Sequence, residues 1–204
     1  MNKEGEMQEI ASFITSCTKC DLSETRTHVV VGEGSLDAAI MFIGEAPGYH
    51  EDMQGRPFVG KAGKILDELL SSIDLQRTDV FIANILKCRP PNNRNPLQSE
   101  IKACTGYLNR QIECIKPSIL IPMGSFATSF LLEKYGIINE KISSAHGKIL
   151  KKSTIYGEIT IMPMYHPAAA TYNPRMKILL ENDFRILQDY LSNTKPQLSG
   201  MQHQ

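Results

Sequence analysis

The sequence predicts a single α/β domain in which a small parallel sheet of about four strands is covered by helices on both faces, a three-layer α/β/α arrangement. Short apolar runs rich in Ile and Val alternate with segments of helical periodicity along most of the chain. This alternation is typical of parallel sheets, whose strands are buried on both faces and are therefore almost continuously apolar. A length of 204 residues suits one domain with a sizeable core.

The elements are predicted in order from their periodicity. Helices are expected where apolar side chains recur every three to four residues, over 4–14, 61–73, 99–115, 125–135 and 175–191. Strands are expected at the short apolar runs 38–43, 80–84, 118–123 and 158–164. The last segment is polar, and a disordered tail is predicted from residue 193 to residue 204.

Composition excludes some classes of protein. The 22 basic and 22 acidic side chains cancel, so the net charge does not by itself indicate a nucleic-acid partner. No apolar run approaches the ~20 residues of a membrane span, and the first residues lack the apolar stretch of a signal peptide. A cytoplasmic location is therefore expected, where the five cysteines would serve as ligands or buried thiols rather than as disulfides.

The segment 44–63, GEAPGYHEDMQGRPFVGKAG, is the most informative part of the chain. Its five glycines and two prolines predict no regular element. It lies between a strand and a helix, where open α/β sheets place their ligand sites. Unlike a phosphate-binding loop it carries the acids Glu45, Glu51 and Asp52 and the aromatic Phe58. This composition suits chemistry on a ring better than binding of a phosphate.

Other polar side chains follow further predicted strands and would meet this loop at one edge of the sheet. If the site holds a flipped-out base, Phe58 can stack on it, and the amide of Asn84 can both donate to and accept from its edge. A donor at His166 would stabilise negative charge on a departing base. A carboxylate, Glu45 or Glu51, would offset positive charge on the sugar and orient a water molecule.

Structural roles are open alternatives for most of these residues. Phe58 suits an ordinary core position, and Asn84 suits a turn cap at the end of a strand. His166, which precedes a proline, suits a hydrogen-bonded structural histidine. Glu51 and Asp52 suit a solvated surface.

The cysteine spacing predicts a metal site. Cys17 and Cys20 form a C-x-x-C pair, and together with Cys88 and Cys104 they could supply four thiolates. Zinc and a four-iron cluster both accept such a set, and the spacing does not decide between them. A buried, unliganded thiol is the alternative for Cys104, which lies on the apolar stripe of its helix. Cys114 would lie about 80° farther round the same helix and is expected to take no part.

Three motifs in order, GEAPGYHEDMQGRPFVGKAG, NILKCRPPNNRNP and YHPAAA, together with the cysteine pattern, resemble the iron–sulfur family 4 uracil-DNA glycosylases. The resemblance runs from about Cys17 to Leu191. It implies a single glycosylase domain over residues 1–192 and a structural [4Fe–4S] cluster on the four cysteines. It also implies a monofunctional hydrolase of base excision repair that releases uracil from DNA and leaves an abasic site.

The same resemblance implies roles for the site residues. Glu45 and Ala46 would lie in the uracil-contacting loop, with Phe58 stacked on the base and Asn84 at its edge. Asn93 lies in the PPNNR loop, which is part of the second motif. Glu51 would position water or exclude the methyl group of thymine, and the resemblance leaves open which acid handles the water. His166 would contact the uracil O2 side, and the segment after it would fill the gap left by the flipped nucleotide.

The implied partner is uracil-containing DNA, single- or double-stranded, bound by a monomer in the nucleoid region of the cytoplasm and without any membrane. The sequence leaves a replication sliding clamp open as a further partner. Lys61 and Lys87 are expected to contact phosphates rather than to act as nucleophiles. Two rival hypotheses are a non-catalytic sensor of deaminated bases and a protein that holds zinc instead of iron and sulfide.

Overall fold

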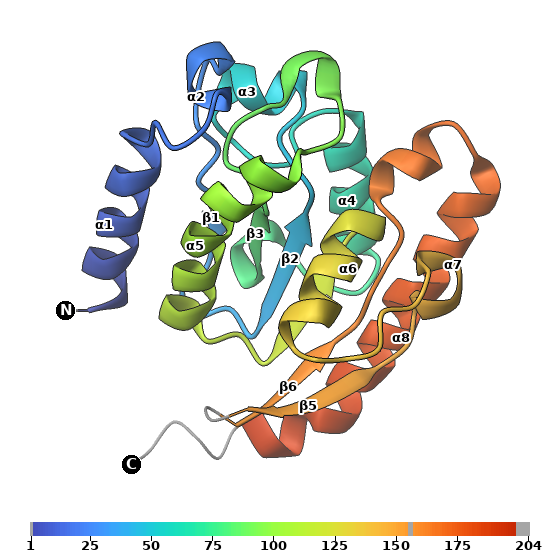
Figure 1. Cartoon of the computed structure of the whole chain (residues 1–204). Helices are drawn as coiled ribbons and strands as arrows, with labels where there is room; N and C mark the ends of the chain where they lie inside the picture. Colours follow the sequence, from blue (N-terminus) through green and yellow to red (C-terminus); the bar gives the residue numbers. More distant parts are fainter. Residues whose placement is uncertain (1, 155–156, 199–204) are drawn as a thin grey trace.

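A mixed six-stranded sheet forms the centre of the computed structural model, which describes residues 2–154 and 157–198 (Figure 1). The strand order is β1-β3-β2-β4-β6-β5. The strands are β1 (Glu33–Gly34), β2 (Ile40–Gly44), β3 (Phe81–Asn84), β4 (Ile119–Pro122), β5 (Leu150–Thr154) and β6 (Gly157–Ile161). The four strands predicted from the sequence are the four central ones, and they are parallel to one another. The α/β prediction is therefore confirmed.

The two edge strands are additional to the predicted sheet and run antiparallel to their neighbours, β1 beside β3 and β5 beside β6. Neither carries the apolar run on which the other predictions rested. β1 is only two residues long, and the middle of β5 is exposed and carries Lys151 and Lys152. Lysines on an exposed edge discourage pairing with another chain.

Side chains alternate between two cores, one on each face of the sheet. On β2, Met41 and Ile43 belong to the core under α1, α5 and α6, whereas Ile40 and Phe42 belong to the core under α4 and α8. The ring of Phe42 stacks on that of Phe184 in α8, with centroids 5.8 Å apart. The three predicted layers are thus present, because the sheet lies between two layers of helices (Figure 1).

The predicted helices correspond to α1 (Lys3–Thr15), α4 (Lys61–Ser71), α5 (Gln98–Ile115), α6 (Ser125–Lys134) and α8 (Pro174–Leu198). Further short elements are α2 (Leu22–Thr25), α3 (Tyr49–Gln54), α7 (Ile142–Ala145) and the 3₁₀ turns Arg77–Asp79, Pro91–Asn93 and Pro167–Thr171. No helix in the described part of the chain is both long and apolar enough to cross a membrane.

Two segments that were predicted to be irregular are partly helical. The segment 44–63 was expected to hold no regular element, but it contains α3, which begins after Gly48 and ends at Gly55 with a left-handed φ of 67°. Glycines at both ends thus bound a short helix rather than prevent it. The predicted tail falls partly on α8, which continues to Leu198, and partly on residues 199–204, which lie outside the described residues.

Candidate functional site

The carboxyl ends of β2 and β3 bring Gly44 and Asn84 side by side. The two residues are register partners, and the Asn84 side chain is buried with 2% of its surface exposed. A Cβ atom on residue 44 would lie 2.2 Å from Asn84 Oδ1 and 2.8 Å from Cζ of Phe58. Glycine is therefore required at this position, because the amide and the aromatic ring both close over it.

The Asn84 side chain has an unused acceptor. Its Oδ1 atom is buried and has no hydrogen-bond partner among the described residues. A buried acceptor left unpaired costs roughly 1–3 kcal/mol, so such atoms are few in folded proteins. The amide is thus held in a position where a bound ligand, rather than the chain, can complete its hydrogen bonds.

Phe58 and His166 face each other as stacked rings, with centroids 5.4 Å apart and an angle of 25° between the planes. Phe58 is 5% exposed and packs against the core under α4 and α8. Phe58 is thus a core residue, and its ring also bounds the site beside His166. Its φ of 52° is left-handed, a conformation that a bulky residue rarely adopts without external support.

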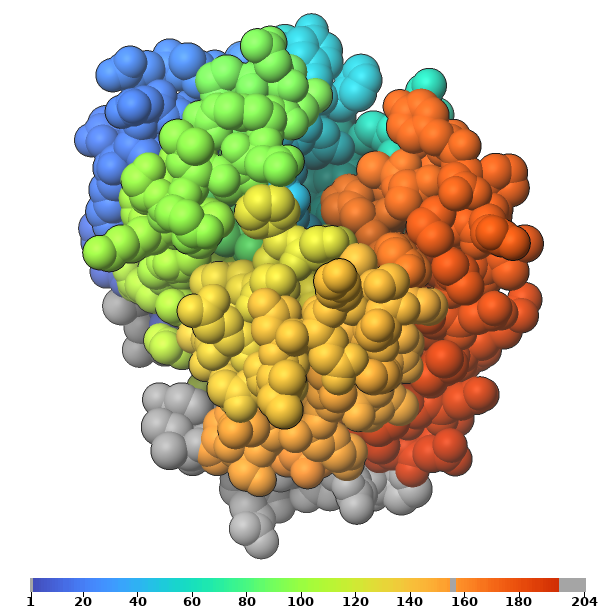
Figure 2. All heavy atoms as spheres, turned by 45° about the vertical axis from the view of Figure 1, so that its right-hand side comes forward, coloured from blue at the N-terminus to red at the C-terminus, as the bar shows by residue number. Residues whose placement is uncertain are grey.

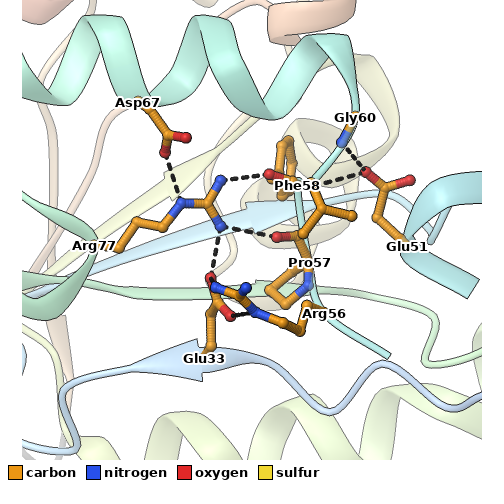
Figure 3. A network of polar contacts seen from close by, with 9 residues as sticks. Glu33, Glu51, Arg56, Pro57, Phe58, Gly60, Asp67 and Arg77 are labelled. Carbon is orange, nitrogen blue, oxygen red and sulfur yellow. Dashed lines mark hydrogen bonds and ion pairs between the residues drawn. The ribbon is translucent and has the colours of Figure 1, made fainter. Parts of the chain in front are cut away.

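Two side chains support the backbone around Phe58 (Figure 3). Glu51 Oε1 accepts hydrogen bonds from the N–H groups of Val59 and Gly60, at 3.0 and 3.1 Å. From the other side, Arg77 donates to the carbonyl oxygens of Pro57, at 2.9 Å, and of Phe58. Glu51 is therefore engaged with the chain and is not a solvated acid.

His166 is positioned as a neutral hydrogen-bond donor. Its Nδ1 accepts a hydrogen bond from the N–H of Ala168, at 3.1 Å. Burial lowers the pKa of His166 to about 4, against the opposing effect of the Glu51 charge. At neutral pH the single proton of this imidazole therefore lies on Nε2, because the other nitrogen is an acceptor. A neutral ring with a free N–H can stabilise a developing anion.

Glu45 follows Gly44 directly, at the end of β2. Its carbonyl oxygen accepts a hydrogen bond from the N–H of Leu86, at 3.0 Å, which ties the start of the loop to the segment after β3. The side chain is half-buried, and burial raises the pKa of its carboxyl group. The next residue, Ala46, is half-buried and packs against the core under α1 and α5.

We call Gly44, Glu45, Phe58, Asn84 and His166 together the carboxyl-edge site. Figure 2 shows the surface hollowed where the cyan, green, yellow and orange parts of the chain meet. Gly124 lies beside His166: its φ of 90° is left-handed, and a Cβ on residue 124 would lie 3.2 Å from the Cβ of His166. The start of α6 thus also needs a glycine to let His166 approach.

Asn93 lies in the exposed 3₁₀ turn Pro91–Asn93. It is exposed, has a left-handed φ of 54°, and its Oδ1 accepts a hydrogen bond from Nε of Arg89 at 2.7 Å. The guanidinium of Arg89 in turn lies over the ring of Tyr49, 5.1 Å from its centroid. Asn93 therefore orients a cation on the surface and makes no contact with the buried amide of Asn84 among the contacts described.

Two expectations about charged residues are wrong. Asp52 is not solvated: it is 3% exposed, and its Oδ1 accepts hydrogen bonds from the N–H groups of Thr27 and His28. Lys87 is not a surface lysine: it is 1% exposed, and its Nζ donates to Asn84 O at 2.8 Å and to Gln111 Oε1 at 2.7 Å. Lys87 is therefore too deep to contact a phosphate, whereas Lys61 is exposed.

Four of the five cysteines line one pocket, which we call the cysteine pocket: Cys17, Cys20, Cys88 and Cys104. Cys17 and Cys20 come from the turn between α1 and α2, Cys88 from the segment after β3, and Cys104 from α5. Among the described residues no three His, Cys, Asp or Glu side chains lie close enough to hold one metal ion.

Hydrogen bonds from two basic residues reach the sulfurs of this pocket. The N–H of Lys87 donates to Sγ of Cys104 at 3.3 Å, and Arg26 donates to Sγ of Cys88 at 3.4 Å. Arg26 also donates to the carbonyl oxygen of Cys17, at 2.9 Å. Donors of this kind suit sulfurs that carry negative charge, as thiolates bound to a metal cluster do.

Cys114 lies elsewhere, as expected from its place on the helix. Its thiol donates to the carbonyl oxygen of Lys3 at 3.5 Å, and burial raises its pKa, with Glu6 adding to the effect. It does not line the cysteine pocket.

Three basic side chains with central positions were not recognised from the sequence: Arg26, Arg77 and the buried ammonium of Lys87. The contacts of Arg77 span 10 to 44 residues of sequence, so no local pattern marks them. The sequence around Lys87, with Arg89 and two prolines close by, is also typical of an exposed loop. Only the presence of Cys88 next to Lys87 hinted that this segment is buried.

Comparisons with known proteins agree with one another. A family model described as the uracil DNA glycosylase superfamily matches residues 31–191. A type-4 uracil-DNA glycosylase of Saccharolobus solfataricus is 50% identical over 186 residues, 90% of this chain and 86% of the relative. Another from Archaeoglobus fulgidus is 42% identical over 192 residues, 94% of this chain and 96% of the relative. A third from Sulfurisphaera tokodaii is 46% identical over 184 residues, which cover 90% of this chain and 84% of the relative.

Proposed function

The chain belongs to the type-4 uracil-DNA glycosylases of the uracil-DNA glycosylase superfamily, and we propose that it hydrolyses the N-glycosidic bond of deoxyuridine in DNA at the carboxyl-edge site. The products are free uracil and an abasic site. The observation that carries this assignment is the Oδ1 of Asn84, which is buried near the ring of Phe58 and has no hydrogen-bond partner among the described residues.

Asn84 selects the base. Its amide donates to the uracil O4 and accepts from N3–H, so uracil completes the hydrogen bonds that the chain leaves open. Cytosine presents the reverse pattern and would leave buried groups mispaired, which can give roughly 10⁴-fold rejection. Phe58 contributes an aromatic face on which the planar base stacks. The base must leave the helix to reach this site, at a cost of a few kcal/mol.

His166 stabilises the departing base. Cleavage of the bond between N1 and C1′ leaves negative charge on the uracil ring and positive charge on the sugar. The Nε2–H of the neutral His166 donates to the uracil O2, assisted by backbone N–H groups of Glu45 and Ala46. The donor is fixed before the reaction because the Ala168 N–H already holds the other ring nitrogen.

Glu45 orients the water, and Glu51 positions the loop. Glu51 already uses Oε1 to accept two backbone N–H groups beside Phe58. Burial alone raises the pKa of Glu45, which indicates a carboxylate that no neighbouring charge or donor stabilises. Glu45 offsets the sugar cation and accepts a proton from water as the water oxygen bonds to C1′.

The four cysteines of the cysteine pocket bind a structural [4Fe–4S] cluster. The four cysteines line one pocket, and hydrogen-bond donors reach two of their sulfurs. The similarity of the chain to type-4 uracil-DNA glycosylases favours iron and sulfide over zinc. Through these four cysteines, the α1–α2 turn, the segment after β3 and α5 would be cross-linked by a bound cluster. The chain's own residues carry out every step of the reaction.

The enzyme is monofunctional and acts on DNA as a monomer of one domain, residues 1–192, in the nucleoid region of the cytoplasm. Lys87 cannot form a Schiff base because its ammonium is enclosed by Asn84, Gln111 and Val31.

Phosphate contacts need only a local basic rim, to which Arg89 and Lys61 are suited. Either single- or double-stranded DNA can present the uracil, and a replication sliding clamp is a further candidate partner.

The assignment is tested with an oligonucleotide that carries a single uracil. We expect free uracil in the supernatant and strand breakage only after treatment with alkali. A matched oligonucleotide with cytosine at the same place should stay intact. Breakage before alkali would indicate a lyase, and binding without uracil release would favour the sensor hypothesis. A brown preparation with broad visible absorption is expected, whereas a colourless, zinc-loaded one would contradict the cluster.

A further inference from the structure

We propose that Arg77 is a positioning residue that holds Phe58 against His166, and that the reaction depends on it although it lies outside the site. This inference rests on the proposed function for its effect on catalysis. Its structural part, the placement of the Phe58 ring, is independent of that function.

Arg77 is the centre of a network that ends at the Phe58 backbone (Figure 3). Its Nε donates to Asp67 on α4, and its Nη1 donates to Glu33 on β1, each at 2.6 Å. Nη1 also donates to Pro57 O at 2.9 Å, and Nη2 donates to Phe58 O. Two acids thus fix the guanidinium, and its remaining donors fix two consecutive carbonyl groups.

The Phe58 backbone needs this support because its conformation is unfavourable in itself. A left-handed φ at a bulky residue persists only where the surroundings determine it. Glu51 holds the two N–H groups that follow, and Arg77 holds the two carbonyl groups at and before the strained residue. The first turn of α4 adds a steric limit, because a Cβ on Gly63 would lie 1.7 Å from Phe58 O.

Only a forked cation meets the geometry. A lysine ammonium is a single nitrogen, whereas the guanidinium presents donors on three nitrogens in one plane. Without the fork the carbonyl groups of Pro57 and Phe58 lose their donors, and residue 58 can relax toward ordinary backbone angles. The ring would then move from the face of His166 and from the place where the base stacks.

The chain supplies a matched control in Arg56. This residue pairs with the same acid, Glu33, at 2.8 Å, but its side chain is 60% exposed, whereas that of Arg77 is 20% exposed. The described hydrogen bonds of the Arg56 guanidinium both go to Glu33, and none goes to either carbonyl group in Figure 3. Arg56→Met therefore removes one cation from Glu33 and leaves the support of Phe58 in place.

The first measurement is the NMR shift of the His166 ring protons in the iron–sulfur-loaded protein without DNA. The stacked Phe58 ring shifts these protons, so the shift reports its position. In Arg77→Met we expect the His166 resonances to move toward those of a histidine without an aromatic neighbour. In Arg56→Met we expect them to stay at the wild-type position. Unmoved resonances in Arg77→Met would overturn the proposal.

The second measurement is kcat for uracil release at saturating oligonucleotide. A misplacement of about 1 Å can cost ~100-fold, so we expect Arg77→Met to lower kcat by roughly 10- to 100-fold. Arg56→Met should stay within about twofold, because exposed ion pairs contribute little. Equal losses in the two variants would show that Glu33 pairing, and not the position of Phe58, is what matters, and would overturn the proposal.

A third variant covers the case in which Arg77→Met does not fold. Arg77→Lys keeps a cation between Glu33 and Asp67 but loses the fork, so it should fold, shift the His166 resonances and lower kcat. Wild-type values for both would refute the role of Arg77. Because the NMR measurement uses no DNA, it decides about Arg77 even if the wild-type protein releases no uracil, a result that would count against the proposed function alone.

Discussion

The cysteine pocket and the carboxyl-edge site differ in how their polar groups are satisfied. In the pocket, Arg26 and the Lys87 N–H donate to cysteine sulfurs. At the carboxyl-edge site, Asn84 Oδ1 lacks a partner among the described residues, and burial raises the pKa of Glu45 without compensation. Unpaired buried groups destabilise a fold by roughly 1–3 kcal/mol each. The sulfurs of the pocket thus have hydrogen-bond donors within the chain, whereas the groups at the carboxyl-edge site are left for a ligand to satisfy.

Lys87 joins the two regions. Its N–H donates to Cys104 in the pocket, and its Nζ donates to the carbonyl oxygen of Asn84 at the edge site. A change in the pocket should therefore affect both regions, whereas a change at the edge site should affect activity alone. Variants in each region test this asymmetry.

The largest effect is expected from loss of a pocket cysteine. In Cys88→Ala we expect loss of the cluster's visible absorption and a fall in Tm of roughly 10 °C or more, because cluster binding contributes folding free energy. Uracil release should fall with it through the link to Asn84. Cys114→Ala is the control, since this buried thiol faces Lys3 at a distance from the pocket. Cluster loss in Cys114→Ala would show that the ligand assignment is wrong.

The next effect separates activity from stability. Asn84→Asp replaces the donor of the amide with an acceptor, so we expect a loss of uracil release that approaches ~10⁴-fold, with cluster absorption unchanged. Asn109→Asp is a matched control, because Asn109 Oδ1 is also buried without a partner among the described residues but lies on α5. Rates and absorption spectra of the two variants would be compared. A similar loss of rate in both would contradict base recognition by Asn84.

The sequence was sufficient for the central part of the fold. The strands β2, β3, β4 and β6 are recognisable because burial on both faces makes them continuously apolar. The edge strands are not, since β1 has two residues and β5 exposes lysines. The helix α3 was missed because its six residues lie between glycines that, taken alone, indicate a loop.

The candidate site was predictable where its groups lie at or shortly after strand ends. Asn84 ends β3, Glu45 directly follows β2, and His166 comes after the segment that leaves β6. The supporting network was not, because Arg77 reaches acceptors up to 44 residues away and nothing local marks it. The burial of Lys87 could not be predicted from the sequence either, since a lysine is normally exposed and becomes buried only when acceptors enclose it. Sequence patterns thus reveal the candidate site residues at strand ends more readily than the residues that support them through distant contacts.

The smallest effect concerns the pH dependence of the rate, which tests whether Glu45 is the uncompensated acid. Glu45 acts as a carboxylate, and its pKa is raised by burial, so single-turnover uracil release should fall as the pH drops through a value above the ordinary 4.5 of a glutamate. His166 should add no step near 6.5, because its pKa is about 4.

Glu45→Gln should lower the rate by roughly 10²–10³-fold and abolish the acid limb. Glu51→Gln, which keeps a side-chain oxygen to accept the Val59 and Gly60 N–H groups, should retain that limb. If instead the limb disappears in Glu51→Gln and persists in Glu45→Gln, Glu51 is the acid that handles the water and Glu45 only shapes the loop.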